Sequence, residues 1–149
     1  MDRSSFRSNT VSPEEWAATW LRHTWERRRE DFWAWDELTF TVLEDPERAW
    51  PVIVQLTQQA SDIDLEHIGA GPIEHLVEYH GRAFIDRIEA EAARNELFRG
   101  ALATIWLNEW NQDPDVVTRT VAASGGVIEP FYLDIDKAER EDALRRDGA

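Results

Sequence analysis

The chain is divided into short segments that begin with a capping residue and a proline and then carry apolar residues at helical spacing. Ser12–Pro13, Asp45–Pro46 and Asp113–Pro114 each place a capping side chain before a proline that fits the first turn of a helix. The alternating apolar pattern of a half-buried strand is absent. The sequence therefore predicts helices and no sheet.

Glycine and proline residues predict where these helices end. Gly69 to Pro72 indicate a tight turn, and Gly81 is placed to end the helix that Pro72 begins. Pro51 lies past the first turn of its helix, so we expect a kink or a restarted helix near Trp50. The expected helices cover about residues 12–29, 31–44, 45–60, 62–68, 72–81, 82–94, 96–110 and 113–123.

Of these segments, 96–110 has the clearest helical periodicity. Its apolar residues are Leu97, Phe98, Ala101, Leu102, Ile105 and Trp106. The two ends of the chain look different. Residues 1–11 are polar and predict a flexible tail, residues 12–123 form the helical domain, and residues 124–149 form an extended segment followed by a charged tail. Within that last part, 127–133 predict an extended strap because Pro130 disfavours a helix.

The predicted fold is all-α, an irregular bundle of about six to eight short helices with an extended C-terminal strap. Helix pairs opened by Asp-Pro or Gly-Pro resemble an α-solenoid, but no fixed repeat period is present. The 149 residues suffice for one domain with a hydrophobic core. The chain has no cysteine, which excludes disulfides, thiolate metal sites and a cysteine nucleophile.

The charge balance excludes one class of partner. Lys and Arg number 16 against 30 Asp and Glu, for a net charge of -14, and a phosphate backbone requires a cationic surface. We therefore expect no nucleic acid partner. No apolar run is long enough for a signal-peptide core or a membrane span, so we expect no membrane contact and a cytoplasmic protein.

The acidic residues are concentrated in the middle of the chain, and so are the tryptophans. Residues 31–80 hold eleven acids and one arginine, and six of the eight tryptophans lie between positions 16 and 50. Indoles bury large areas in cores and at interfaces alike. Trp33 and Trp35 cannot share one face of a helix, so one of them is a candidate for a second interface.

The leading hypothesis is a protein-binding module without catalytic activity or cofactor, such as an immunity protein, an antitoxin or a phage-type inhibitor. An acidic surface would attract a partner with a basic surface, and an aromatic anchor would hold it. A structural homo-oligomer that pairs an exposed tryptophan face is an alternative. The predicted partner-binding residues are Trp33, Asp36, Glu37, Glu44, Asp45, Glu47, Asp62, Asp64 and Glu66.

A metal-binding or hydrolytic protein is the second alternative, because three of the four histidines lie close together among glutamates. The residues that would serve it are His67, Glu74, His75, Glu78 and His80. The spacing that helical metal sites use, Glu-x-x-His or His-Glu-x-x-His, is absent. No nucleophile elbow, serine triad or phosphate-binding loop is apparent either.

Several phrases of the sequence resemble a bacterial domain family of unknown function. These are WAWDEL at 33–38, DPERAW at 45–50 and AGPIEHL at 70–76, and the resemblance continues through FIDRIEAEA and ALATIWLNEW to cover about residues 13–110. The resemblance implies a helical domain of bacterial or phage origin and brings no functional residues with it. Pro51 departs from the family's pattern, which puts a straight helix at that position in doubt.

Overall fold

The computed structural model describes residues 3–109, 112–131 and 135–147, and the chain is mostly helical over these ranges. The α-helices are α1 Pro13–Glu26, α2 Phe32–Glu44, α3 Pro46–Gln59, α4 Leu65–Ile68, α5 Glu74–Arg94, α6 Glu96–Leu102, α7 Pro114–Ala123 and α8 Ile135–Asp147. The described ranges contain no β-strand, only a bridge between Asn108 and Phe131. The all-α prediction is confirmed.

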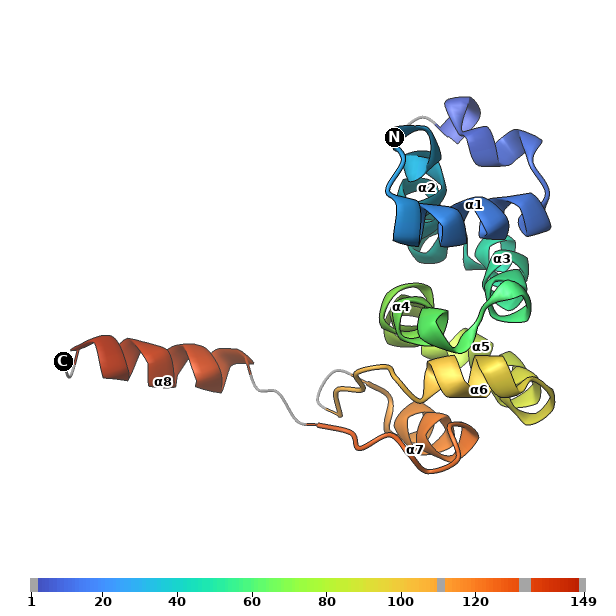
Figure 1. Ribbon diagram of the computed structural model, residues 1–149. Helices are drawn as coiled ribbons and strands as arrows, with labels where there is room; N and C mark the ends of the chain where they lie inside the picture. Colours follow the sequence, from blue (N-terminus) through green and yellow to red (C-terminus); the bar gives the residue numbers. More distant parts are fainter. Residues whose placement is uncertain (1–2, 110–111, 132–134, 148–149) are drawn as a thin grey trace.

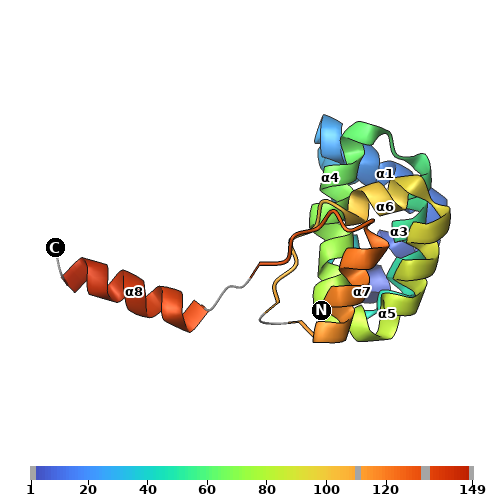
Figure 2. The ribbon, with the colours of Figure 1, turned by 90° about the horizontal axis from the view of Figure 1, so that it is seen from below.

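The helices follow one another through the molecule in chain order (Figure 1). α1, α2 and α3 pack together at one end, and α5 packs against α6 and α7 at the other. Contacts of α2 with α5 and of α3 with α6 join the two groups. Seen from below, α8 projects away from this body (Figure 2). The result is an irregular bundle.

Local capping explains where the main helices begin. The Ser12 hydroxyl accepts a hydrogen bond from the backbone amide of Glu15 at 3.1 Å, and Pro13 occupies the first turn of α1. Asp113 likewise accepts from the amide of Asp115 at 2.9 Å, at the start of α7. The predicted starts at these two positions are confirmed.

A continuous cluster of buried apolar side chains connects the two groups of helices. The indole of Trp50, on α3, lies 5.9 Å from the Phe84 ring of α5 and 5.8 Å from the Phe98 ring of α6. Trp16, on α1, is buried and donates its indole N–H to the Ala34 carbonyl of α2 at 3.0 Å. Burial of these large rings stabilises the bundle.

The predicted turn at Gly69–Pro72 is wrong. The chain continues from α4 through a π-helical turn, Gly69–Ile73, directly into α5. A Cβ on Gly69 would lie 2.0 Å from Thr104 Oγ1 and 2.2 Å from the Ala101 carbonyl oxygen. Gly69 therefore allows the end of α6 to approach closely, and it does not end a helix.

The predicted helix end at Gly81 lies next to a break in α5, and the two helices predicted over 72–81 and 82–94 correspond to the two parts of this element. α5 runs on through this position, with a kink at His80, whose backbone is non-helical at φ -135° and ψ 19°. A Cβ on Gly81 would lie 2.8 Å from Val116 Cγ1, so the glycine makes room for α7. The predicted helices 72–81 and 82–94 are thus one bent element.

The helix predicted over 96–110 stops at Leu102. Thr104 donates its hydroxyl to the Ala101 carbonyl at 2.7 Å, and the amide of Trp106 donates to Glu74 Oε1 at 2.6 Å. Leu107 then accepts a hydrogen bond from the amide of Phe131 of the strap, and the amide of Glu109 donates to the Phe131 carbonyl. These bonds compete with the helical ones, and the β-branched Thr104 and its neighbour favour the extended path.

Two further expectations differ from the structure. α3 continues through the exposed Pro51 without a restart. Residues 3–10, predicted as a flexible tail, form the 3-10 turns Arg3–Ser5 and Arg7–Thr10 and contact α2. The Phe6 ring lies edge-on to Phe40 at 5.5 Å.

The C-terminal part contains an extended stretch and the helix α8. Ile128 is buried, and the amide of Phe131 donates to the Leu107 carbonyl at 2.9 Å, so residues 127–131 form an extended strap. The predicted strap residues 132 and 133 lie outside the described ranges. Within those ranges, none of the helices is both long enough and apolar enough to cross a bilayer.

Candidate functional site

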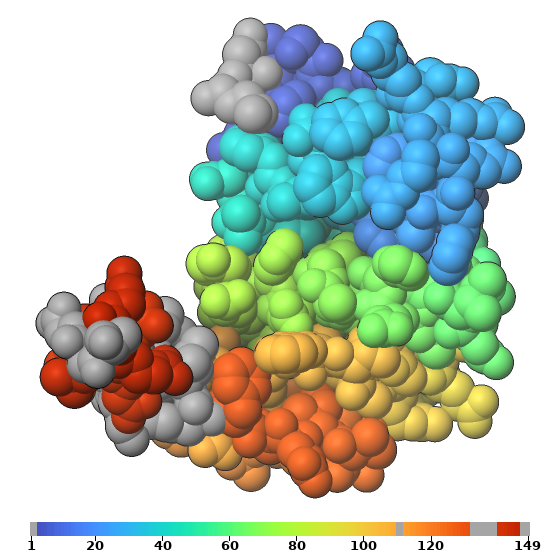
Figure 3. Space-filling view, turned by 60° about the vertical axis from the view of Figure 1, so that its left-hand side comes forward, coloured from blue at the N-terminus to red at the C-terminus, as the bar shows by residue number. Residues whose placement is uncertain are grey.

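A pocket of about 310 Å³ lies where α1 and α2 face the segment from α4 to the start of α5. In Figure 3, α2 in light blue to cyan and this green segment meet across one face of the molecule. One wall consists of Trp20, Trp35, Leu38, Thr39 and Val42, and the other of His67, Ala70, Gly71, Pro72 and His75.

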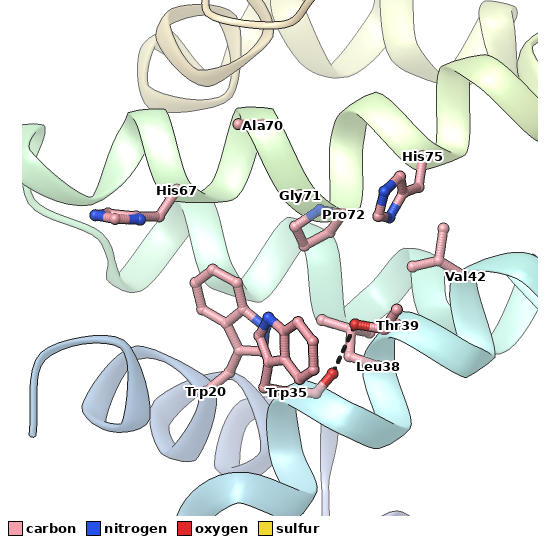
Figure 4. A pocket seen from close by; sticks show the side chains of 10 residues that line it. All are labelled: Trp20, Trp35, Leu38, Thr39, Val42, His67, Ala70, Gly71, Pro72 and His75. Carbon is pink, nitrogen blue, oxygen red and sulfur yellow. Dashed lines mark hydrogen bonds between the residues drawn. The ribbon is translucent and has the colours of Figure 1, made fainter. Parts of the chain in front are cut away.

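The two indoles of the pocket lie next to each other on the α1 and α2 side (Figure 4). Trp20 is buried, whereas 44% of Trp35 is exposed. The hydroxyl of Thr39 donates to the Trp35 carbonyl at 2.9 Å, so it is bound to its own helix. The floor is apolar, because Leu38 and Val42 are fully buried.

The opposite wall is the π-helical turn. Pro72 has no amide hydrogen and so cannot donate a helical hydrogen bond. A π-helical turn accommodates this more readily than a regular α-helix, because its hydrogen bonds already join residues five apart and not four. Such turns recur at functional sites. Here Gly71 and Pro72 lie on the side of the turn toward the two indoles, with His67 and His75 on either side of them (Figure 4).

A second, smaller pocket of about 90 Å³ adjoins the first. The two pockets share Trp20, Trp35, His67 and Gly71, and we call them together the aromatic groove. The smaller pocket adds His23, Thr24 and Arg27, at the C-terminal end of α1.

Three exposed aromatic rings surround the groove. Trp25 is 52% exposed, Phe32 46% and Trp35 44%. The Phe32 ring lies 5.7 Å from Trp35 and 5.7 Å from His23, and the Trp25 ring lies edge-on to His67 at 5.2 Å. Trp25, near the end of α1, thus lies on the surface.

Polar contacts fix these rings in place. The Trp25 indole N–H donates to Asp64 Oδ1 at 2.5 Å, and this bond ties the end of α1 to the start of α4. The Arg22 guanidinium donates two hydrogen bonds to the buried Asp31 carboxylate, at 2.7 and 2.8 Å. These hydrogen bonds hold the pKa of Asp31 below its usual value. Because Asp31 precedes Phe32, the pair orients the start of α2 against α1.

The predicted partner-binding carboxylates do not form one surface. Glu37 is buried and accepts from the backbone amides of Arg7 and Ser8, at 3.3 and 2.9 Å. Asp64 is buried in a capping box with Ser61. The exposed Glu47 pairs with Arg87 at 2.7 Å.

The remaining members of the predicted set are on or near the surface. Asp45 is half-buried at the start of α3. Asp36, Glu44, Asp62 and Glu66 are exposed. Of these, Asp36 follows Trp35 in the chain and Glu66 precedes His67, so both stand beside residues that line the groove.

Of the two tryptophans on α2, the structure exposes Trp35 and packs Trp33 against the core. The Trp33 ring lies 6.3 Å from that of Trp16. The spacing of the two tryptophans predicts that only one of them faces the core, but it does not predict which one. The groove itself was not predicted, because its two walls are more than twenty residues apart in sequence.

The histidines and glutamates of the metal alternative have separate partners. His80 Nε2 lies 2.9 Å from the Leu43 carbonyl oxygen, Glu74 accepts from the Trp106 amide, and His67 contacts Trp25. His75 lines the larger pocket and Glu78 is exposed. Among the described residues, no group of three or more histidine or acidic side chains is arranged to hold a metal ion.

Comparison with known proteins adds a family but no activity. The sequence model of a family described as a family of unknown function, DUF6869, matches residues 13–126. This range contains the whole aromatic groove. No curated protein and no solved structure matches the chain.

Proposed function

Because the chain belongs to the family of unknown function DUF6869, which brings no activity with it, we propose from its own geometry that it is a protein-binding module. The observation that carries the proposal is that the exposed Trp35 lines the pocket, while two further exposed rings contact lining residues, Phe32 against Trp35 and Trp25 against His67. Aromatic side chains at a pocket are typical of the residues that dominate binding energy at protein interfaces.

The groove suits an apolar side chain of a partner. Its volume is at the lower end of that of ligand sites, and the buried Trp20, Leu38 and Val42 form a preformed apolar floor. Contact with the partner would remove the exposed part of Trp35 and Phe32 from water. Burial of apolar area contributes about 25 cal/mol per Å² to the binding free energy, from which the entropic costs of association are then subtracted.

The partner that we propose has a basic surface. The net charge of -14 favours encounter with a cationic protein, and the exposed Asp36 and Glu66 are adjacent in sequence to the groove-lining Trp35 and His67. Fast, tight capture of an oppositely charged partner suits an immunity protein, an antitoxin or a phage-type inhibitor. A cytoplasmic setting is part of the proposal, and the cysteine-free composition is compatible with it.

Selection of a random peptide library against the immobilised chain tests the proposal. We expect the selected peptides to carry basic residues around an apolar anchor. Trp35→Ala should lower their affinity at least about tenfold, as for a central interface residue. Trp106→Ala is the matched control, because Trp106 is 74% exposed and lies outside the groove. Binders that tolerate both Trp35→Ala and Phe32→Ala would contradict the groove as the binding site.

The same aromatic surface also supports a second candidate, a homo-oligomer in which two copies cover each other's rings. Light scattering at high concentration separates the two functions. A dimer that Trp35→Glu dissociates, together with no selected peptide, would favour self-association. A monomer at all concentrations would exclude it.

A further inference from the structure

Arg27 is the one full cation that lines the aromatic groove within the part of the chain that the structure describes. The other titratable side chains of its two pockets are His23, His67 and His75, and no described carboxylate lines either pocket. In a chain with 30 acids and a net charge of -14, this local absence of negative charge stands out.

The backbone at Arg27 supports a role for its side chain. The residue adopts the left-handed conformation, φ 54° and ψ 33°, and its amide donates to the His23 carbonyl at 3.0 Å to end α1. Glycine and asparagine adopt this conformation at less cost than arginine does. Arg27 is also exposed and has no ion-pair partner among the described residues, so its charge is not neutralised by any of them.

We infer that the partner segment bound in the aromatic groove carries an aspartate or glutamate next to its apolar anchor, and that this carboxylate pairs with Arg27. The inference rests on the proposed protein-binding function and names the chemistry of its partner. The anchor occupies the larger pocket between Trp35 and Pro72. The carboxylate then reaches the smaller pocket, where Arg27 offers a planar fork that matches it.

The pair would fix the orientation of the partner. Arg27 attracts a carboxylate at one end of the groove, whereas the net charge of -14 disfavours further acids elsewhere on the partner. A basic segment with one acid in the correct position therefore fits in one direction only. Basic segments without that acid bind less tightly, which is specificity through a charge in a defined position.

Three peptides test the inference. They share a central phenylalanine in a glycine and serine background and differ only in the next residue, which is glutamate, glutamine or lysine. Binding is followed by the indole N–H signals of Trp20 and Trp35 in two-dimensional NMR spectra. We expect the glutamate peptide to bind about two- to fivefold more tightly than the glutamine peptide, as for a partly exposed ion pair, and the lysine peptide to bind most weakly.

Two variants with the same change of net charge localise the effect. Arg27→Asn should abolish the preference for glutamate over glutamine, and its fold should tolerate the change because asparagine fits the left-handed conformation. Arg29→Asn, two residues along the chain and not lining either pocket, should keep the preference. Arg27→Glu should reverse the preference, so that the lysine peptide binds best.

The outcomes separate this inference from the function on which it rests. If the glutamine peptide shifts both indole signals as strongly as the glutamate peptide does, the role of Arg27 is overturned while the groove stands. If none of the three peptides shifts these signals at millimolar concentration, the groove itself is overturned as a peptide site. A preference for glutamate that survives Arg27→Asn also contradicts the pairing.

Discussion

Gly69 and Gly71 lie two residues apart in the same π-helical turn, but their surroundings differ. At Gly69 an added Cβ would meet Thr104 Oγ1 and the Ala101 carbonyl within 2.2 Å, whereas at Gly71 it would meet no atom within 4 Å. The first glycine is therefore required by the packing of α6 against the turn. The second faces the aromatic groove and is free of that constraint.

Gly69→Ala should destabilise the fold by about 2–3 kcal/mol, because the Thr104 side chain and the end of α6 must move. Gly71→Ala should leave the free energy of unfolding nearly unchanged or raise it by up to about 1 kcal/mol, because alanine restricts the unfolded chain. Urea denaturation of both variants measures the difference. Equal stability of the two variants would contradict the close approach at Gly69.

The Arg22–Asp31 pair predicts a dependence of stability on pH. Hydrogen bonds from Arg22 lower the pKa of Asp31 in the folded protein. A lowered folded pKa contributes stability above the unfolded value, about 3.9, and this contribution is lost as the pH falls through the folded pKa.

Asp31→Asn should therefore cost about 1–2 kcal/mol at neutral pH, through loss of charge-assisted hydrogen bonds, and the cost should shrink below about pH 4. Denaturation of both proteins from pH 7 to pH 3 measures it. Asp36→Asn is the control, because Asp36 is exposed and no shift of stability with this signature is expected from it. A difference in the free energy of unfolding that stays constant down to pH 3 would contradict a stabilising Arg22–Asp31 pair.

At the scale of elements, arginines attach α7 to α5. Arg119, on α7, donates to Asp86 and Glu89 of α5, and the hydrogen bonds with Glu89 and then Asp86 raise its pKa above the usual value. Arg82, on α5, donates to Asp113 and Asp115 at the start of α7. Ion pairs across one helix interface thus supplement the contact of Gly81 with Val116.

Arg119→Met keeps the apolar stem but removes the charged fork, so it should loosen α7 locally. We expect amide hydrogens of α7 to exchange severalfold faster, while those of α1 and α3 exchange as before. Added salt should speed exchange in the original protein and have less effect on the variant, because part of the network is exposed. Arg140→Met on α8 makes the same change of charge away from α7, and an equal effect from it would refute the local explanation.

The helix starts could be predicted from the sequence because capping is local. Ser12 and Asp113 bond to amides two or three residues away, which leaves a readable signal. Helix ends were predicted wrongly where a residue contacts another part of the chain that is distant in sequence. Gly69 makes room for α6, and the helix predicted over 96–110 ends because Trp106 bonds to Glu74 and the residues after it bond to the strap.

The candidate site was less predictable than the fold for the same reason. Tryptophan content indicated an interface, but the exposure of Trp35 and burial of Trp33 depend on where Trp16 lies. Glu37 and Asp64 read as surface acids in a charged stretch, yet each accepts backbone hydrogen bonds inside the fold. Only packing across α1, α2 and α4 distinguishes an acid that supports the fold from one that faces a partner.

For the whole molecule, charge and aromatic surface should control different steps of binding. The net charge of -14 acts over a Debye length and so affects encounter, whereas Trp35 acts only after contact. Long-range attraction changes the association rate, and loss of a buried anchor changes the dissociation rate.

The kinetics of a selected basic peptide should therefore separate the two contributions. Between about 0.05 and 0.5 M salt the association rate constant should fall about tenfold or more, while the dissociation rate constant changes little. Trp35→Ala should instead raise the dissociation rate constant and leave the association rate constant nearly unchanged. Asp36→Asn combined with Glu66→Gln should lower the association rate and flatten its salt dependence more than Glu129→Gln on the exposed strap does. If salt slows association no more for the original chain than for the doubly neutralised one, attraction by these carboxylates plays no part, and the partner need not be basic.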